Sequence, residues 1–245
     1  MPTLIDLRLK ATWTVTPDTR KLHGLACALF EGQAAAPGEH AGQHKQFSIS
    51  PLRPAPGGTA TEWSWRVAWL PDSPLPATAV DPGALRVGHV TCAVTETIQR
   101  RVTRAALASG AAPAGVTVSF GSPTYFAQNG TGVLLPDPRL ITGSWRRRWN
   151  ASLPSDDPLL VGEDAWKPMH QSLTLAAFDL RTSTRDTGHD RDQPGFTGTA
   201  TLRLPRNAPK ETRQLLSALA RFAEFSGTGA QITHGFGVTT PLECP

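Results

Sequence analysis

The sequence predicts an α+β protein made of two tandem ferredoxin-like (RRM-like) βαββαβ domains, residues 1–110 and 116–245. Three observations lead to this prediction. Short runs of alternating apolar and polar residues indicate strands, and segments with apolar residues at helical spacing separate them. The order of these segments in the first half of the chain is repeated in the second half. Residues 108–115, ASGAAPAG, lie between the halves and have the composition of a linker.

The first half begins with an alternating strand that carries Ile5, Leu7 and Leu9 on one face. A helix is expected next, between a capping Asp18 or Thr19 and Gly32, because Asp and Thr suit helix N-termini and Gly suits C-termini. The other expected elements are strands at 45–52 and 62–70, a short helix or loop at 71–85, and a strand from Val90 to Ile98 that ends in Arg100, Arg101 and Arg104.

The second half opens with a strand at 116–126. Asp137 as the cap and Pro138 at the first helical position predict a helix that carries Ile141, Trp145 and Trp149 on one side. The other expected elements are an acidic loop at 154–164, strands at 170–180 and 195–204, a charged hairpin tip at 181–193, a helix opened by Asn207 and Pro209, a glycine-rich loop and a final strand.

Composition favours a nucleic-acid partner. The chain has 24 Lys and Arg against 20 Asp and Glu, a net charge of +4, and most of its basic residues are Arg. Arginine forks bind phosphate bidentately and stack on bases. A GC-rich genome, which enriches Arg, Ala, Gly and Pro together, explains the same bias, so charge alone does not decide between the two.

The cysteines indicate a reducing compartment. Only three are present, far apart in the sequence, which argues against a disulfide framework or a zinc site. The sequence shows neither a signal peptide nor an apolar run long enough for a membrane helix. We therefore expect a cytoplasmic protein with no membrane partner, no metal and no cofactor.

Residues 226–240, SGTGAQITHGFGVTT, contain four glycines, Gly227, Gly229, Gly235 and Gly237. Glycine lets another backbone come close, and a loop of this kind can present N–H groups to a phosphate. The spacing fits neither a Walker A loop nor the dinucleotide fingerprint, because no GK[ST] follows and the helix precedes the loop. The segment 215–237 resembles the C-terminal glycine-rich motif of the RAMP superfamily. More narrowly, it resembles the CRISPR-associated endoribonucleases that cut repeat RNA into guide RNAs, the Cas-six family.

The resemblance extends over nearly the whole chain. Segments similar to the same family follow one another in order: LHGLACALFEG, KQFSISPL, FGSPTYF with LLPDPRLITGSWRRRWN, and GFTGTATLRL. The weakest part is 71–88, where we find no specific match. The resemblance implies metal-independent cleavage of CRISPR repeat RNA, in which a ribose 2′-OH attacks the adjacent phosphate to leave a 2′,3′-cyclic phosphate and a 5′-OH. Retention of the product and assembly with other CRISPR-associated proteins would be consistent with it.

This reaction needs a base for the 2′-OH, a cation for the crowded phosphorane and a proton for the leaving oxygen. In the family that the chain resembles, a catalytic histidine, where present, follows the first helix and precedes a Lys ahead of a Phe. The matching residues are His40 or His44, with Lys45 as the cation before Phe47. We rank His40 first because it precedes Lys45 by five residues. Some family members lack the histidine and rely on arginines.

The candidate RNA-binding residues are arginines near the second helix and the hairpin, together with the glycine-rich loop: Arg146, Arg147, Arg148, Arg181, Arg185, Arg191, Gly227, Gly229, His234, Gly235 and Gly237. Two other functions stay open. A RAMP subunit that binds guide RNA as a scaffold would share the fold and the loop but would not need the histidine and lysine. An unrelated tandem RRM protein would be expected to carry an aromatic-rich RNP1 string, which this sequence lacks.

Overall fold

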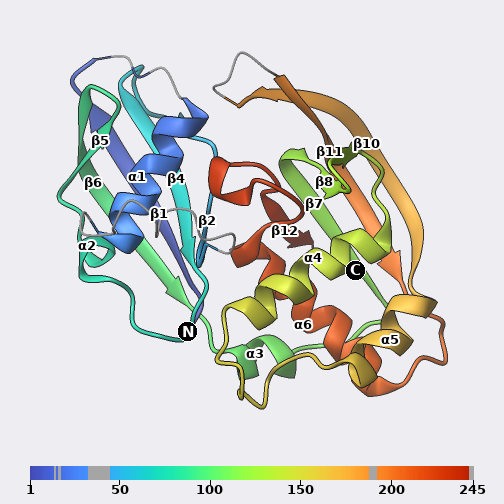
Figure 1. The fold of residues 1–245 in the computed structure, drawn as a ribbon. Helices are drawn as coiled ribbons and strands as arrows, with labels where there is room; N and C mark the ends of the chain where they lie inside the picture. The colour runs from blue at the N-terminus through green and yellow to red at the C-terminus, as the bar shows by residue number, and fades with distance from the viewer. Residues whose placement is uncertain (14, 16–17, 33–44, 188–191, 243–245) are drawn as a thin grey trace.

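The computed structural model describes residues 1–13, 15, 18–32, 45–187 and 192–242, which fold into two halves (Figure 1). The first half contains β1 (Thr3–Ala11), α1 (Thr19–Glu31), β2 (Phe47–Ile49), β3 (Arg53–Pro54), β4 (Glu62–Trp69), α2 (Ala77–Val80), β5 (Ala84–Val87) and β6 (Val90–Arg101). A short helix, α3 (Arg104–Ser109), leads to the second half. That half contains β7 (Gly115–Thr124), β8 (Phe126–Gln128), β9 (Thr131–Val133), α4 (Pro138–Ala151), α5 (Glu163–Ser172), β10 (Thr174–Asp186), β11 (Asp192–Arg203), α6 (Lys210–Ser226), the 3₁₀ turn η2 (Ile232–His234) and β12 (Thr239–Leu242).

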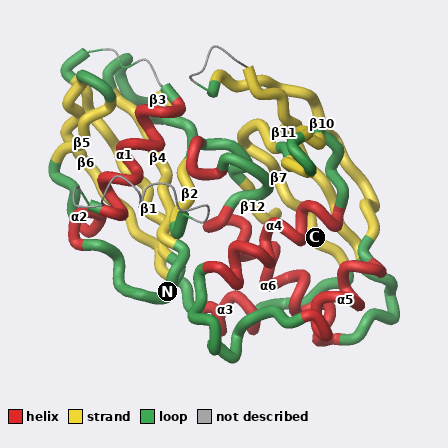
Figure 2. The backbone as a smooth tube through the Cα atoms, in the orientation of Figure 1, coloured by secondary structure: helices red, strands yellow, loops and turns green. Residues whose placement is uncertain are grey.

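Both sheets have the ferredoxin-like strand order. The first sheet runs β2-β4-β1-β6-β5, with β3 also paired to β4, and the second runs β10-β11-β7-β12. When the added strands β3 and β5 are left out of the first sheet, its strand order becomes 2-3-1-4, numbered along one βαββαβ unit. The second sheet has the same antiparallel 2-3-1-4 order. Figure 2 shows α1 lying across the first sheet and α4 and α6 across the second. The predicted fold class is confirmed.

Local sequence accounts for the ends of two of these helices. Asp18 caps α1 by accepting hydrogen bonds from the backbone N–H groups of Arg20 and Lys21, and Gly32 ends it with a φ of 75°. Asp137 caps α4 by accepting from the backbone N–H of Arg139, with Pro138 as the first helical residue. Asp18, one of the two caps considered for α1, and the predicted Gly32 and Asp137 are therefore the caps observed.

The two halves share a core. Leu4 of β1 and Ala68 of β4 point away from α1 and belong to the apolar cluster of the second half. Arg104 of α3 is completely buried at this junction, where its guanidinium lies between the rings of Trp149 and Phe222. One Nη of Arg104 donates to the carbonyl of Leu70 (3.0 Å) and to Oγ of Ser152 (2.7 Å). These contacts join the two halves across the segment in which we placed the domain boundary, and the boundary itself stays a proposal.

Several segments differ from the sequence-based expectation: β5, α3 and the β8–β9 hairpin were not expected, and two further segments were assigned wrongly. Residues 163–172 form helix α5, where we expected the end of an acidic loop and the start of a strand. Burial of Trp166 and Met169 stabilises this helix even though Pro168 lies inside it. The expected hairpin tip at 181–193 was also wrong in extent, because β10 continues to Asp186 and β11 begins at Asp192. Arg181 and Arg185 therefore belong to a strand.

No helix in the described part of the chain is long and apolar enough to span a membrane.

Candidate functional site

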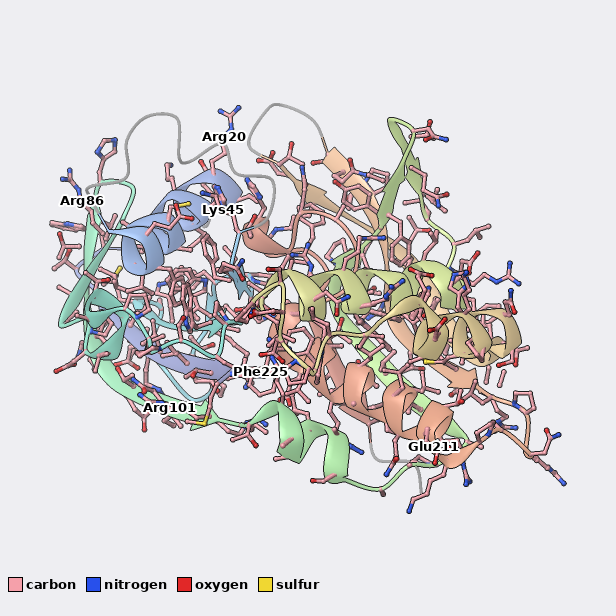
Figure 3. All side chains as sticks on the ribbon, turned by 60° about the horizontal axis from the view of Figure 1, so that its bottom comes forward. Arg20, Lys45, Arg86, Arg101, Glu211 and Phe225 are labelled. Atoms are coloured by element: carbon pink, nitrogen blue, oxygen red, sulfur yellow. The ribbon has the colours of Figure 1, made fainter. Side chains whose placement is uncertain are left out.

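A cavity of about 550 Å³ opens where the two halves meet. Its polar and charged lining comes from distant parts of the chain: Lys45 and Gln46 before β2, Gln128 of β8, and Ser144, Arg147 and Arg148 of α4. Gly229 and Ala230 of the glycine-rich loop line it as well. Figure 3 shows Lys45 beside α1, on the side of the first half that faces the second. The cavity therefore brings together four of the residues predicted from the sequence: Lys45, Arg147, Arg148 and Gly229.

Lys45 is held in place by an ion pair. Its Nζ lies 2.8 Å and 2.9 Å from the two carboxylate oxygens of Glu31, the last residue of α1. The lysine side chain is 11% exposed. A lysine ammonium has three N–H groups, and these two bonds use two of them. The neighbouring Gln46 donates its amide to the carbonyl of Ala151 in α4, which ties this segment to the second half.

The three consecutive arginines of α4 have different environments, because successive residues of a helix point about 100° apart. Arg146 packs over the ring of Trp166, donates to the carbonyl of Val161 (3.0 Å) and pairs with Glu163 (2.7 Å). Arg147 is exposed and lines the cavity. Arg148 reaches inward, with one Nη 3.5 Å from the carbonyl oxygen of Gly229.

Arg148 carries its charge in a partly buried setting. Burial and the neighbouring Arg147 guanidinium lower the pKa of Arg148 to about 10, so it remains protonated at neutral pH. A cation with few waters around it interacts more strongly with an anion than one at the surface does. Arg148 is thus a partly buried cation of the cavity, and Arg147 is its exposed neighbour.

The glycine-rich loop is packed into the protein. Gly227, Gly229, Gly235 and Gly237 all have positive φ values and are buried. Their N–H groups donate to protein oxygens, among them Oγ of Ser144 for Gly229 and the carbonyl of Pro123 for Gly237. A Cβ at Gly237 would lie 1.9 Å from the carbonyl oxygen of Thr228. The glycines therefore permit close backbone contact within the fold, while their contact with RNA stays a prediction.

His234 also makes a contact between the two halves. Its ring stacks on that of His23 from α1, with the centroids 4.0 Å apart and an interplanar angle of 11°. The Nδ1 of His23 lies 2.9 Å from the carbonyl oxygen of Thr233. In this structure the two rings join α1 to the loop, and RNA binding by His234 stays a prediction.

The chain is similar in sequence to known proteins of one family. The family model described as CRISPR-associated endoribonuclease Cas6 matches residues 118–239, which span β7, α4, α6 and the glycine-rich loop. The chain belongs to the Cas6 family. It is 35% identical over 122 residues to the CRISPR-associated endoribonuclease Cas6 of Mycobacterium tuberculosis, and this alignment covers 49% of the chain. The matched stretch spans 36% of that relative's length, so about two thirds of the relative lies outside the match.

Solved Cas6 structures are similar over nearly the full chain. A Cas6 product complex from Thermus thermophilus is 27% identical, with a TM-score of 0.83, and the match covers 99% of this chain and 100% of that one. A second Cas6, in a substrate mimic complex, is 25% identical with a TM-score of 0.75 and covers 98% and 99%. The resemblance noticed in the sequence is therefore confirmed at the level of the family and the fold.

Not every predicted site residue of this Cas6 family member can be placed. His40, His44 and Arg191 lie outside the described residues, so their roles stay predictions. Arg181 and Arg185 lie on the same face of β10, four residues apart, and do not line the cavity. Within the described residues, no group of three or more His, Cys, Asp and Glu side chains comes together as a metal site would require.

Three polar residues that line the cavity were missed from the sequence. Ser144 lies between two predicted core positions of α4, and Gln46 lies next to Lys45, so neither attracted separate attention. Gln128 precedes an Asn-Gly turn, Asn129 and Gly130, that joins β8 to β9. Asn-Gly is a strong signal for a tight hairpin and could have identified this element.

Proposed function

We propose that this chain is an endoribonuclease that cleaves CRISPR repeat RNA into mature guide RNAs and stays bound to its product. One observation carries the proposal: Lys45 of the first half and Arg147 and Arg148 of the second line a single cavity. Such a convergence of cations suits an RNA phosphate. The family name and the product and substrate-mimic complexes of similar Cas6 proteins support the same reading.

The proposed reaction needs no metal. The base, His40 or His44, takes the proton of a ribose 2′-OH, and the oxygen then attacks the adjacent phosphorus. The bond from phosphorus to the 5′-oxygen breaks, and that oxygen takes up a proton, leaving a 2′,3′-cyclic phosphate and a 5′-OH. Lys45, through the N–H that Glu31 does not use, and Arg148 stabilise the charge on the phosphate oxygens.

The test is incubation with labelled repeat RNA in EDTA. We expect a single cut, at the same rate as without EDTA, and a product that carries a 2′,3′-cyclic phosphate. The same RNA with a 2′-deoxy sugar at the cut site should not be cleaved, because the nucleophile is missing. Full loss of cleavage in EDTA, with recovery on adding Mg²⁺, would show that the reaction depends on a metal.

The runner-up is a non-catalytic RAMP subunit that holds guide RNA as a scaffold, acting with other CRISPR-associated proteins in the cytoplasm. The fold and the cavity cations would serve this role equally well. Tight RNA binding without any cleavage of the repeat, under conditions in which the protein is folded, would favour it.

The arginines of α4 allow a matched comparison. Replacing Arg147 by alanine is expected to weaken RNA binding about tenfold and to reduce the slope of log K against log salt by about one, because an exposed phosphate contact is lost. Arg146→Ala is the control, since Arg146 is engaged by Glu163, Trp166 and Val161; it should lower thermal stability and leave the salt slope unchanged. Equal salt slopes for the two variants would contradict this assignment.

A further inference from the structure

Arg104, the first residue of α3, connects the two walls of the cavity that contains Lys45, although it does not line the cavity itself. One Nη donates to the carbonyl oxygen of Leu70 (3.0 Å) and to Oγ of Ser152 (2.7 Å). Leu70 follows β4 in the first half, and Ser152 ends α4 in the second. A single nitrogen atom therefore binds one oxygen of each half.

On the first half, Leu70 is hydrogen-bonded to the segment that carries Lys45. The backbone N–H of Leu70 donates to the carbonyl oxygen of Gln46 (2.9 Å), and Gln46 directly follows Lys45 in the chain. Leu70 and Gln46 also line the cavity. A displacement of the Leu70 backbone therefore displaces the backbone next to Lys45.

On the second half, Ser152 is hydrogen-bonded to the turn of α4 that carries Arg148. Its Oγ donates to the carbonyl oxygen of Arg148 (2.6 Å), and its backbone N–H donates to the same oxygen (3.1 Å). Arg148 lines the cavity together with Lys45. Both cations that act on the phosphate in the proposed reaction are thus connected to Arg104 through a short series of hydrogen bonds.

The guanidinium of Arg104 is itself held in place. Arg104 is buried, and its guanidinium carbon lies 4.6 Å from the ring centroid of Trp149 and 4.7 Å from that of Phe222. Its Nε lies 3.6 Å from the carboxylate of Asp72. Burial lowers the pKa of Arg104 to about 10, against the opposite effect of Asp72 and Asp157, so it remains a cation at neutral pH. Within the described residues, its Nε and its second Nη make no hydrogen bond, so one Nη carries the whole bridge.

We propose that Arg104 is a positioning residue for the cleavage reaction. By binding Leu70 and Ser152 at once, it fixes the two walls of the cavity relative to each other, so that Lys45 and Arg148 can act on the same phosphate. Small errors in the position of groups that act together on a reacting centre are costly for the rate. The effect on cleavage rests on the proposed function, whereas the effect on the position of the two halves does not.

The first experiment needs no RNA and measures how firmly the two halves are joined. One spin label is attached in each half, at Arg86→Cys on β5 and at Glu211→Cys on α6, after the native cysteines have been replaced by alanine (Figure 3). Arg104→Met keeps an apolar side chain between the two rings and removes the hydrogen bonds. We expect the distribution of distances between the labels, measured by electron paramagnetic resonance, to become broader in Arg104→Met.

Three further variants complete this measurement. Arg104→Lys keeps a cation with N–H donors at the same position and should restore part of the narrow distribution. Leu9→Ala leaves a cavity in the core of the first half alone, so it should lower the melting temperature at least as much as Arg104→Met and leave the distribution unchanged. Ser152→Ala removes the other end of the bridge and takes the place of Arg104→Met if that variant does not fold.

The second experiment measures single-turnover cleavage of the repeat RNA at a temperature at which every variant is folded. Arg104→Met should slow the cut about 100-fold, Arg104→Lys should recover part of this loss, and Leu9→Ala should cut at the unchanged rate. The double variant Lys45→Ala/Arg104→Met should cut little more slowly than the slower single variant, because Arg104 acts through the position of Lys45. A loss of stability alone would not produce this dependence on Lys45.

Three outcomes would overturn the proposal. If the label distances are the same in Arg104→Met and the unchanged protein, Arg104 does not fix the two halves. If the distances broaden but cleavage keeps its rate, the position that Arg104 sets does not matter for the reaction. If the losses of rate in Arg104→Met and Lys45→Ala multiply in full, Arg104 does not act through Lys45.

Failure of the proposed function gives a different result. In that case the unchanged protein does not cut the repeat RNA, and the same pair of variants is compared by the dissociation constant of the RNA. Losses of affinity that do not add would still support Arg104 as the residue that positions Lys45. An affinity that is unchanged in Arg104→Met would overturn that role.

Discussion

Replacing His40 by alanine is expected to slow cleavage of the repeat RNA by about 100- to 10,000-fold, the usual contribution of a single general base. RNA affinity should stay nearly unchanged, because a neutral histidine adds little to phosphate binding. The measurement is a single-turnover cleavage rate at saturating enzyme, together with the dissociation constant of a non-cleavable 2′-deoxy RNA. This separates a loss in the chemical step from a loss in binding.

His44→Ala and His89→Ala complete this experiment. His44 directly precedes Lys45 in the sequence and is the second candidate, so a slow His44 variant beside a normal His40 variant would move the role of the base to His44. His89 lies exposed in the turn between β5 and β6 and serves as the control histidine. If neither His40→Ala nor His44→Ala slows the cut, no histidine of this segment is the base, and the arginines would have to act by charge alone.

Gly237→Ala is expected to lower the free energy of unfolding by more than about 4 kcal/mol. Gly237 has a φ of 66°, and a Cβ there would lie 1.9 Å from the carbonyl oxygen of Thr228, which is backbone and cannot move aside alone. At about 2–4 °C per kcal/mol for a protein of this size, the melting temperature should fall by roughly 10 °C or more. Thermal unfolding followed by circular dichroism measures the effect.

Gly57→Ala is the matched control. Gly57 also has a φ of 66°, but a Cβ there meets no atom within 4 Å. Only the cost of a left-handed conformation applies, about 1–2 kcal/mol. The difference between the two variants isolates the close backbone approach inside the loop. Equal stability of the two variants, with RNA binding lost only in Gly237→Ala, would instead mean that the loop acts chiefly on RNA.

The sequence by itself determined the fold class, most of the secondary structure and the family. Asp18 and Asp137 cap their helices through hydrogen bonds to residues two or three positions away, so the information is local. Strand order followed from the repeated βαββαβ plan, because few topologies are compatible with that order of elements. Lys45 and the arginines of α4 could be identified as candidates because phosphate chemistry requires cations.

The tertiary structure decided which of these candidates meet and which candidates have other roles. Lys45 and Arg148 are about a hundred residues apart in sequence, and only the packing of the two halves places both in one cavity. Helix α5 forms because Trp166 and Met169 are buried, a contribution that local propensity does not include. Three adjacent arginines point into three environments, and the N–H groups of the loop glycines bind protein oxygens. Each of these depends on contacts between distant segments, and burial, hydrogen bonding and charge can be assigned to a residue only once those contacts are known.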